Sequence, residues 1–118
     1  MHVLIRIDAE SSRPLFEQVA SSVRGDILAG RLVPGDRLPS ARDVAEALDI
    51  NLHTVLRAYQ QLRDEALIDL RRGRGAMVSA SAAPLAELAS DVAALVHRAA
   101  SLGISSVTLA ALVTEIES

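Results

Sequence analysis

The feature that most constrains this chain is a pair of short helical patterns joined by a turn of only a few residues. Ser40 begins an S-x-x-D capping box, which predicts a helix over about 41–48. Residues 49–50 leave room for a tight turn, and Asn51 is a good N-cap for a helix that should end near Ala66. Two short helices joined in this way are typical of a helix-turn-helix motif.

The segments on either side of this motif complete a familiar order of elements. Local patterns predict a strand at 3–7, a helix opened by Pro14 and ended by Gly30, a loop at 31–40, and a hairpin of two short strands at 67–70 and 76–79. The apolar stripe of the predicted helix consists of Leu15, Val19, Val23 and Ile27, with Phe16 and Ala20 beside them. The tip of this hairpin is basic and rich in glycine. The order predicts an α+β, mainly helical fold, a winged helix-turn-helix.

The last third of the chain predicts two helices that lack a partner of their own. Residues 80–83 are predicted to be a weakly structured linker, Pro84 to open one helix, and Gly103 to separate it from the last. About 30 residues are too few to bury two apolar stripes on each other, so a second copy of the chain is the simplest cover. We therefore expect a winged-helix domain at 1–80 and a helical dimerisation segment at 81–118. The expected dimerisation residues are Leu85, Leu88, Val92, Leu95, Val96, Leu109, Leu112, Val113 and Ile116.

Charge is unevenly divided between these two parts. Residues 1–81 hold 11 Arg against 11 Asp and Glu, whereas residues 82–118 hold one Arg against four, so the net charge of −3 comes from the tail. The absence of lysine excludes Schiff-base chemistry, and the absence of cysteine excludes disulfides and thiolate metal sites. No signal peptide or membrane span is expected. The composition predicts a cytoplasmic protein that is not an enzyme and needs no cofactor or metal.

The helix after Asn51 is predicted to expose one polar face. On a wheel of about 100° per residue, the core-facing side consists of Val55, Ala58, Tyr59 and Leu62. His53, Arg57 and Gln60 face outward, with Thr54 and Leu56 on the flanks. Recognition helices present the polar face of their N-terminal half to base edges in the major groove, where arginine can bond guanine bidentately. A solvated polar face would give the same pattern. Asn51 could act only as a cap, and Arg57 could pair with Asp64 or contact a phosphate.

Other arginines are candidates for contacts to the DNA backbone. Arg42 lies in the first turn of its helix and can reach a phosphate, or it can pair with Glu46 four residues on. The hairpin tip gathers positive charge, which favours contact with a polyanion; Asp69 could relieve the repulsion instead. The residues of this tip are Arg71, Arg72, Gly73 and Arg74.

Four stretches of the chain resemble the GntR family of bacterial regulators. They are PLFEQV at 14–19, GRLVPGDRLPSAR at 30–42, NLHTVLRAY at 51–59 and GRG at 73–75, in the order and spacing of that family. The resemblance covers residues 3–79 and implies an operator-binding domain. The DNA contacts that it implies are those of Ser40, Arg42, Asn51, His53, Thr54 and Gly73.

The C-terminal part is similar to the YtrA subfamily, in which two dimerising helices stand where larger relatives carry an effector domain. Leu52 and His53 depart from the proline and asparagine usual there, which puts the base preference at these positions in doubt. The resemblance implies a homodimer that binds a palindromic operator and acts as a repressor; a small-molecule effector is left open. The alternative is a winged-helix module that docks an acidic protein partner.

Overall fold

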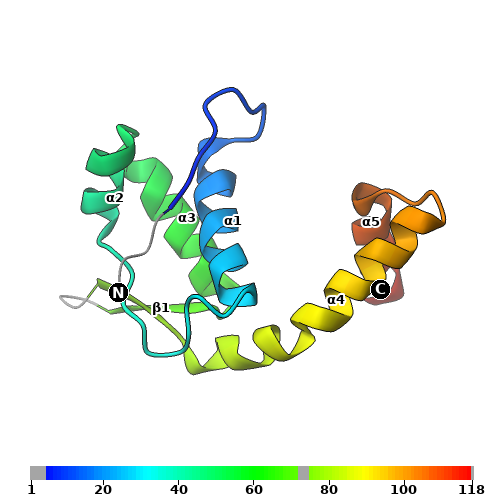
Figure 1. Ribbon diagram of the computed structural model, residues 1–118. Coiled ribbons are helices and arrows are strands. Elements are labelled where there is room, and N and C mark those ends of the chain that lie inside the picture. Colours follow the sequence, from blue (N-terminus) through cyan, green and yellow to red (C-terminus); the bar gives the residue numbers. More distant parts are fainter. Residues whose placement is uncertain (1–4, 72–74, 118) are drawn as a thin grey trace. The chain divides into compact units, whose positions relative to one another are not determined.

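The computed structural model describes residues 5–71 and 75–117 of the chain, which divides into two compact units, Met1–Ala86 and Glu87–Ser118. The elements of the described residues follow one another along the colour gradient of Figure 1. They are α1 (Leu15–Leu28), α2 (Ala41–Leu48), α3 (Leu52–Asp64), β1 (Ile68–Arg71), β2 (Gly75–Val78), a 3₁₀ turn (Ala80–Ala82), α4 (Ala83–Ser101) and α5 (Ser106–Glu117). The predicted mainly helical α+β fold, a winged helix-turn-helix followed by two helices, is confirmed.

The helix-turn-helix forms where the capping residues predict it. The Ser40 Oγ accepts a hydrogen bond from the Asp43 N–H at 3.1 Å and caps α2. Asp49, at φ +55°, turns the chain, and the Asn51 Oδ1 then accepts from the His53 N–H at 2.8 Å to cap α3. Each side chain satisfies a backbone donor that the first helical turn leaves without a partner.

Helix α1 buries the stripe expected for it except at its first turn. Val19, Val23 and Ile27 are almost fully buried in the core, whereas Leu15 is 36% exposed. Pro14 is the N-cap rather than the first helical residue. Gly30 follows the helix at φ +77°, a left-handed conformation that glycine adopts without strain.

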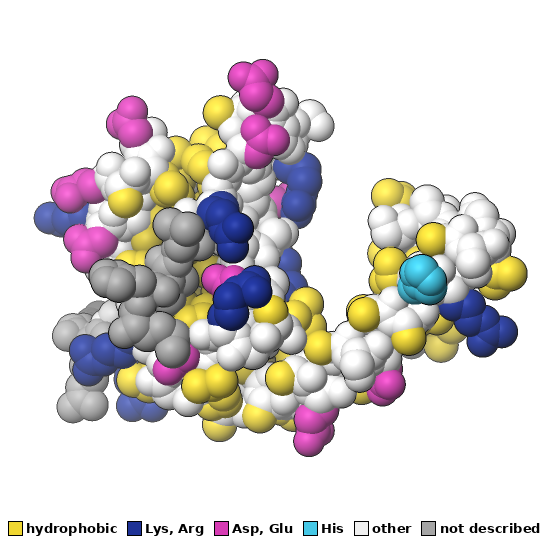
Figure 2. All heavy atoms as spheres, viewed as in Figure 1, with side chains coloured by type: hydrophobic (Ala, Val, Ile, Leu, Met, Phe, Trp, Pro, Cys, Tyr) yellow, Lys and Arg dark blue, Asp and Glu magenta, His cyan; other side chains and the backbone are white. Residues whose placement is uncertain are grey.

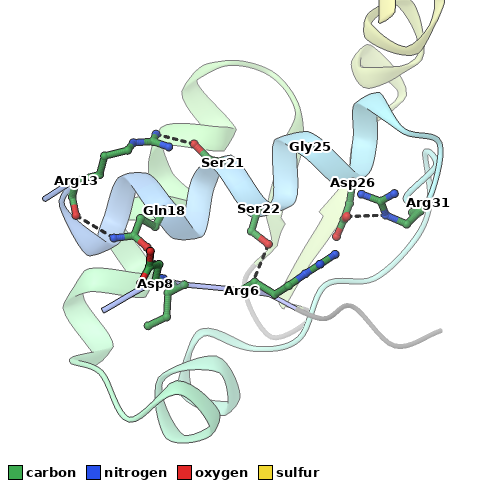
Figure 3. A pocket seen from close by; sticks show the side chains of 10 residues that line it. Arg6, Asp8, Arg13, Gln18, Ser21, Ser22, Gly25, Asp26 and Arg31 are labelled. Atoms are coloured by element: carbon green, nitrogen blue, oxygen red, sulfur yellow. Dashed lines mark hydrogen bonds and ion pairs between the residues drawn. The ribbon is translucent and has the colours of Figure 1, made fainter. Parts of the chain in front are cut away.

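The strand predicted at 3–7 does not form over its described residues, and Val3 and Leu4 lie outside the described range. The backbone of this segment and of the residue after it bonds side chains of α1 instead: the Arg6 N–H donates to the Ser22 Oγ at 3.1 Å, and the Asp8 N–H to the Gln18 Oε1 at 2.6 Å. Figure 3 shows this segment running along α1. Ile5 is buried, so the apolar character of the run serves the core rather than a sheet.

The segment predicted as a loop at 31–40 lies partly along the hairpin. The Val78 N–H donates to the Asp36 carbonyl at 2.8 Å and the Leu38 N–H to the Ala76 carbonyl at 3.0 Å, so residues 36–38 flank β2 on the side away from β1. Arg37 and Met77 form an isolated antiparallel bridge. In the hairpin itself, Ile68 lies opposite Val78 and Arg71 opposite Gly75.

The prediction of a weakly structured linker at 80–83 is wrong. A 3₁₀ turn leads directly into α4, whose first residue is Ala83. Ala82 is 1% exposed, and Leu85 packs against the same core as the three helices. Small apolar residues resemble a linker because they carry no periodic signal, yet they fit closely on a core surface.

The second unit contains the rest of α4 and α5, and little of it is buried. Ala99 is its only buried hydrophobic residue in the described range, and the Ile104 N–H donates to the Ala99 carbonyl at 2.8 Å where the chain turns. Gly103, at φ +80°, ends α4 as predicted, and the Ser105 Oγ accepts from the Thr108 N–H at 3.2 Å. No single described helix is long and apolar enough to cross a bilayer; only the bent pair Ala80–Ser101 and Ser106–Glu117 passes by length and composition.

Candidate nucleic-acid interface

Helix α3 has the two faces that the helical wheel predicts. Its inner face is buried in the core through Val55, Ala58, Tyr59 and Leu62. On the outer face, His53 and Arg57 are exposed and Thr54 is half-exposed. The N-terminal half of α3 therefore offers an imidazole, a hydroxyl and a guanidinium to a partner outside the molecule.

The N-terminus of α2 adds a second polar group. Ser40 and Arg42 are both exposed there. No ion pair joins Arg42 to Glu46 in the part of the chain that the structure describes, where the ion pairs involve Arg24, Arg31 and Arg63. The Ser40 hydroxyl accepts the capping bond and still has its own proton to donate.

Tyr59 fixes the start of α2 relative to α3. Its hydroxyl donates to the Pro39 carbonyl at 2.7 Å, immediately before the cap residue Ser40. Burial raises the pKa of the Tyr59 phenol well above its usual range, because the ionised form would lose its hydration. The neutral phenol therefore ties the residue before the α2 cap to the middle of α3.

The hairpin brings one predicted arginine to the same region. Arg71 is the last residue of β1 and lines a hollow of about 360 Å³ together with Ser40, Leu56 and Gly75. It belongs to the strand rather than to the tip. Arg72, Gly73 and Arg74, the other residues of the predicted hairpin tip, lie outside the described residues. This hairpin is the wing of the predicted winged helix-turn-helix.

A second hollow, of about 410 Å³, opens at the N-terminal half of α3. Four residues predicted to contact DNA line it: Asn51, His53, Thr54 and Arg57. The remaining lining comes from Leu15 and Phe16 of α1, which sequence reasoning assigned only to the apolar stripe of that helix. The guanidinium carbon of Arg57 lies 3.7 Å from the centroid of the Phe16 ring. The ion pair between Arg57 and Asp64 that the sequence allowed does not form, and Asp64 contacts Arg63 at 3.3 Å.

The hollow in Figure 3, of about 460 Å³, lies on another side of α1 and has a different character. Two of its arginines already have partners: the Arg13 Nη2 donates to the Ser21 Oγ at 2.8 Å, and the Arg31 Nε to the Asp26 Oδ1 at 2.8 Å. Asp8 also lines it, so its charges are mixed. Arg13 is therefore a suitable control for the loss of a positive charge outside the candidate interface.

The expected dimerisation residues are mostly exposed. Leu85 packs on the core of the first unit, and Leu109 is half-buried. The other seven, each at least 42% exposed, are Leu88, Val92, Leu95, Val96, Leu112, Val113 and Ile116. Figure 2 shows apolar side chains along the segment formed by α4 and α5.

Within residues 5–71 and 75–117, no group of three or more histidine, aspartate and glutamate side chains is arranged to hold a metal ion. His53 lies beside Asn51, Thr54 and Arg57 in the second hollow. The chemistry that the described site offers is hydrogen bonding and positive charge.

Comparison with known proteins gives a consistent set of relatives. Residues 15–78, just over half of the chain, match the model of the bacterial regulatory proteins of the gntR family. The chain is 40% identical over 79 residues to the HTH-type transcriptional repressor YtrA of Bacillus subtilis, covering 67% of this chain and 61% of that protein. It is 39% identical over 75 residues to the HTH-type transcriptional regulator Rv1152 of Mycobacterium tuberculosis, covering 64% and 62%. The matched segments thus span about three fifths of the length of these two relatives.

Solved structures extend the likeness into the C-terminal helices. YtrA from Sulfolobus acidocaldarius, a GntR-family transcription factor, matches with a TM-score of 0.61 and 34% identity over 82% of this chain and 97% of that one. A GntR family transcriptional regulator from Listeria monocytogenes matches with a TM-score of 0.65 and 27% identity over 92% and 98%. The DNA-binding domain of AraR, in complex with operator ORX1, matches with a TM-score of 0.57 at 21% identity, which supports the fold alone.

Proposed function

Because this chain belongs to the GntR family of bacterial regulatory proteins, we propose that it is a transcription regulator that binds a palindromic operator as a homodimer and acts as a repressor. The observation that carries this proposal is the exposed N-terminal half of α3, where His53, Thr54 and Arg57 lie side by side around one hollow. The helix-turn-helix geometry gives these side chains a natural target, the base edges of the major groove.

The proposal divides the site into two kinds of contact. His53 and Arg57 read base edges, since both are exposed on α3. Contacts to the phosphates fix the register and come from Ser40 and Arg42 at the start of α2, with Asn51 and Thr54 beside the base readers. The wing adds further phosphate or minor-groove contacts through Arg71, Arg72, Gly73 and Arg74.

Base reading is tested by measuring affinity for operators changed one base pair at a time. His53→Ala should relax the preference at one or two positions, by about 1–3 kcal/mol per good contact, and should leave non-specific binding near its original strength. Arg63→Ala is the control and should keep the wild-type base preferences, because Arg63 is exposed in the last turn of the same helix. Wild-type preferences at every position in the His53 variant would remove His53 from the recognition set.

The wing contacts are tested by the salt dependence of binding. Replacing Arg72 and Arg74 by Ala should weaken binding to all sequences alike. The negative slope of log affinity against log salt should become less steep by about 0.9 for each phosphate that the variant no longer neutralises. Arg13→Ala removes one positive charge outside the interface and should leave the slope unchanged. Equal slopes for the wild type and the double variant would exclude the wing from the interface.

The homodimer is proposed on the exposed apolar stripes of α4 and α5, since such surfaces mark association sites. Val92→Asp should convert the dimer to a monomer and greatly weaken operator binding. Ser90→Asp places the same charge about 160° away on α4 and should leave the dimer intact. Sedimentation of both variants decides the matter, and a dimeric Val92 variant would contradict the proposal.

A further inference from the structure

Arg57 is held by an aromatic ring from another helix. Its guanidinium carbon lies 3.7 Å from the centre of the Phe16 ring, which belongs to the first turn of α1. We propose that Phe16 is a positioning residue for operator reading: it holds the Arg57 guanidinium so that its edge is ready to bond a guanine. This inference rests on the proposed function and assigns a specificity role to α1, outside the helix-turn-helix.

The geometry separates the two uses of the guanidinium. Stacking on Phe16 engages the flat face of the group, whereas bidentate bonds to guanine O6 and N7 engage N–H donors along its edge. An unrestrained arginine side chain would lose much conformational freedom when it bonds a base. Because the stack already restricts the side chain before DNA arrives, less freedom is lost on binding.

Within the described part of the chain, no carboxylate competes for Arg57. The acidic side chains at the C-terminal end of α3 are engaged elsewhere: Asp64 contacts Arg63, and Glu65 accepts two hydrogen bonds from Arg24, at 3.0 and 2.7 Å. Among these same residues, the stack on Phe16 is the one interaction of the Arg57 guanidinium, so its N–H donors remain available for a base.

Phe16 is itself suited to act as a fixed platform. It is half-buried and packs against the core cluster, so the ring has limited freedom. It also lines the 410 Å³ hollow with His53 and Thr54, the other residues proposed to face the groove. A ring that served only the core would not need to present a face beneath an exposed arginine at this hollow.

The contact can be tested first in the protein without DNA. Because the Arg57 guanidinium lies over the Phe16 ring, the ring current should shift the Arg57 Nε proton resonance upfield in the wild type. Phe16→Leu keeps the apolar bulk and removes the ring, and the resonance should return to its ordinary position. Phe16→Tyr, the matched control, keeps an aromatic face and should keep the shift. An unshifted wild-type resonance would overturn the inference.

The functional test compares base preferences in the full-length protein. Phe16→Leu should weaken binding to the wild-type operator about two- to fivefold, the range expected for an exposed cation–π contact. Its base preference should relax only at the base pairs where Arg57→Ala also loses its preference. In the Arg57→Ala background, Phe16→Leu should have no further effect, and Phe16→Tyr should retain the wild-type preferences. Melting temperatures of all variants identify any loss of fold.

The outcomes distinguish this inference from the proposed function. Uniform weakening at every operator, additive effects of the two substitutions, or unchanged preferences in the Phe16→Leu protein would overturn the positioning role and leave the proposed function intact. A wild-type protein that discriminates against no base-pair change would overturn the proposed function and this inference with it.

Discussion

Removal of a single oxygen, by Tyr59→Phe, should measure how firmly the start of α2 is held. The Tyr59 hydroxyl donates to the Pro39 carbonyl at 2.7 Å, and the residue is 3% exposed. A neutral intramolecular hydrogen bond contributes about 1 kcal/mol net, and water can reach the half-exposed Pro39 after its loss. For a unit of this size, the variant should melt about 4–8 °C below the wild type near pH 7. Truncation to alanine would cost roughly 3–5 kcal/mol.

The lower melting temperature of the Tyr59→Phe variant relative to the wild type should disappear at alkaline pH. Burial raises the pKa of Tyr59 in the folded protein, so the unfolded chain, with a tyrosine pKa of about 10, releases the phenolic proton first. The stability that this proton contributes is complete below about pH 10 and declines by about 1.4 kcal/mol by pH 11. The phenylalanine variant has no such term, so the two melting temperatures should converge or cross near pH 11.

The assay is clean because Tyr59 is the only tyrosine in the chain, so tyrosinate absorbance reports it alone. We expect that absorbance to appear together with the loss of helical circular dichroism. Equal differences in melting temperature near pH 7 and pH 11, or tyrosinate absorbance in a protein that is still helical near pH 10, would refute the reasoning.

Three further predictions concern stability. Gly25→Ala should raise the unfolding free energy by about 0.4–1 kcal/mol, since a Cβ there meets nothing within 4 Å. Gly30→Ala should lower the unfolding free energy, because this residue has φ +77°. Calorimetry that gives both changes the same sign would contradict this. Ser40→Ala should cost about 1 kcal/mol in urea denaturation through loss of the α2 cap, and an unchanged midpoint would exclude the cap. Arg24→Ala should cost at most about 1 kcal/mol, because its pair with Glu65 is about a third exposed, and a loss that does not shrink at high salt would exclude the ion pair as its cause.

The parts of the fold that sequence predicts well are those specified by neighbours along the chain. The start of α2 follows from Ser40, and the start of α3 follows from Asn51, because each cap bonds a donor only two or three residues away. The buried face of α3 follows from helical periodicity alone. Local signals of this kind need no knowledge of the tertiary structure.

The errors arise where a distant segment decides the outcome. Residues 5–7 have the composition of a strand, but a side chain of α1 takes the backbone donor of Arg6. Residues 80–83 have the composition of a linker, but the core of the first unit buries Ala82. No periodic pattern encodes such pairings, so composition alone misleads.

The candidate site shows the same division. Sequence reasoning selects His53 and Arg57 because the wheel of one helix exposes them. It misses Phe16, whose contact with Arg57 spans 41 positions along the chain. An aromatic residue at a stripe position on α1 is expected in the core, and only the packing of α1 beside α3 reveals its exposed face.

The packing of Ala82 and Leu85 determines where this chain can be divided and recombined with a related one. Ala82 belongs to the core of the first unit and Leu85 packs against it, although the sequence predicts a weakly structured linker at 80–83. A chimaera that exchanged the C-terminal helices at residue 80 would remove two pieces of the acceptor's own interior. Modular exchange, in the laboratory or in the divergence of related regulators, should therefore succeed at junctions placed after Ala86, within a continuous helix, where only the outward-facing sequence changes.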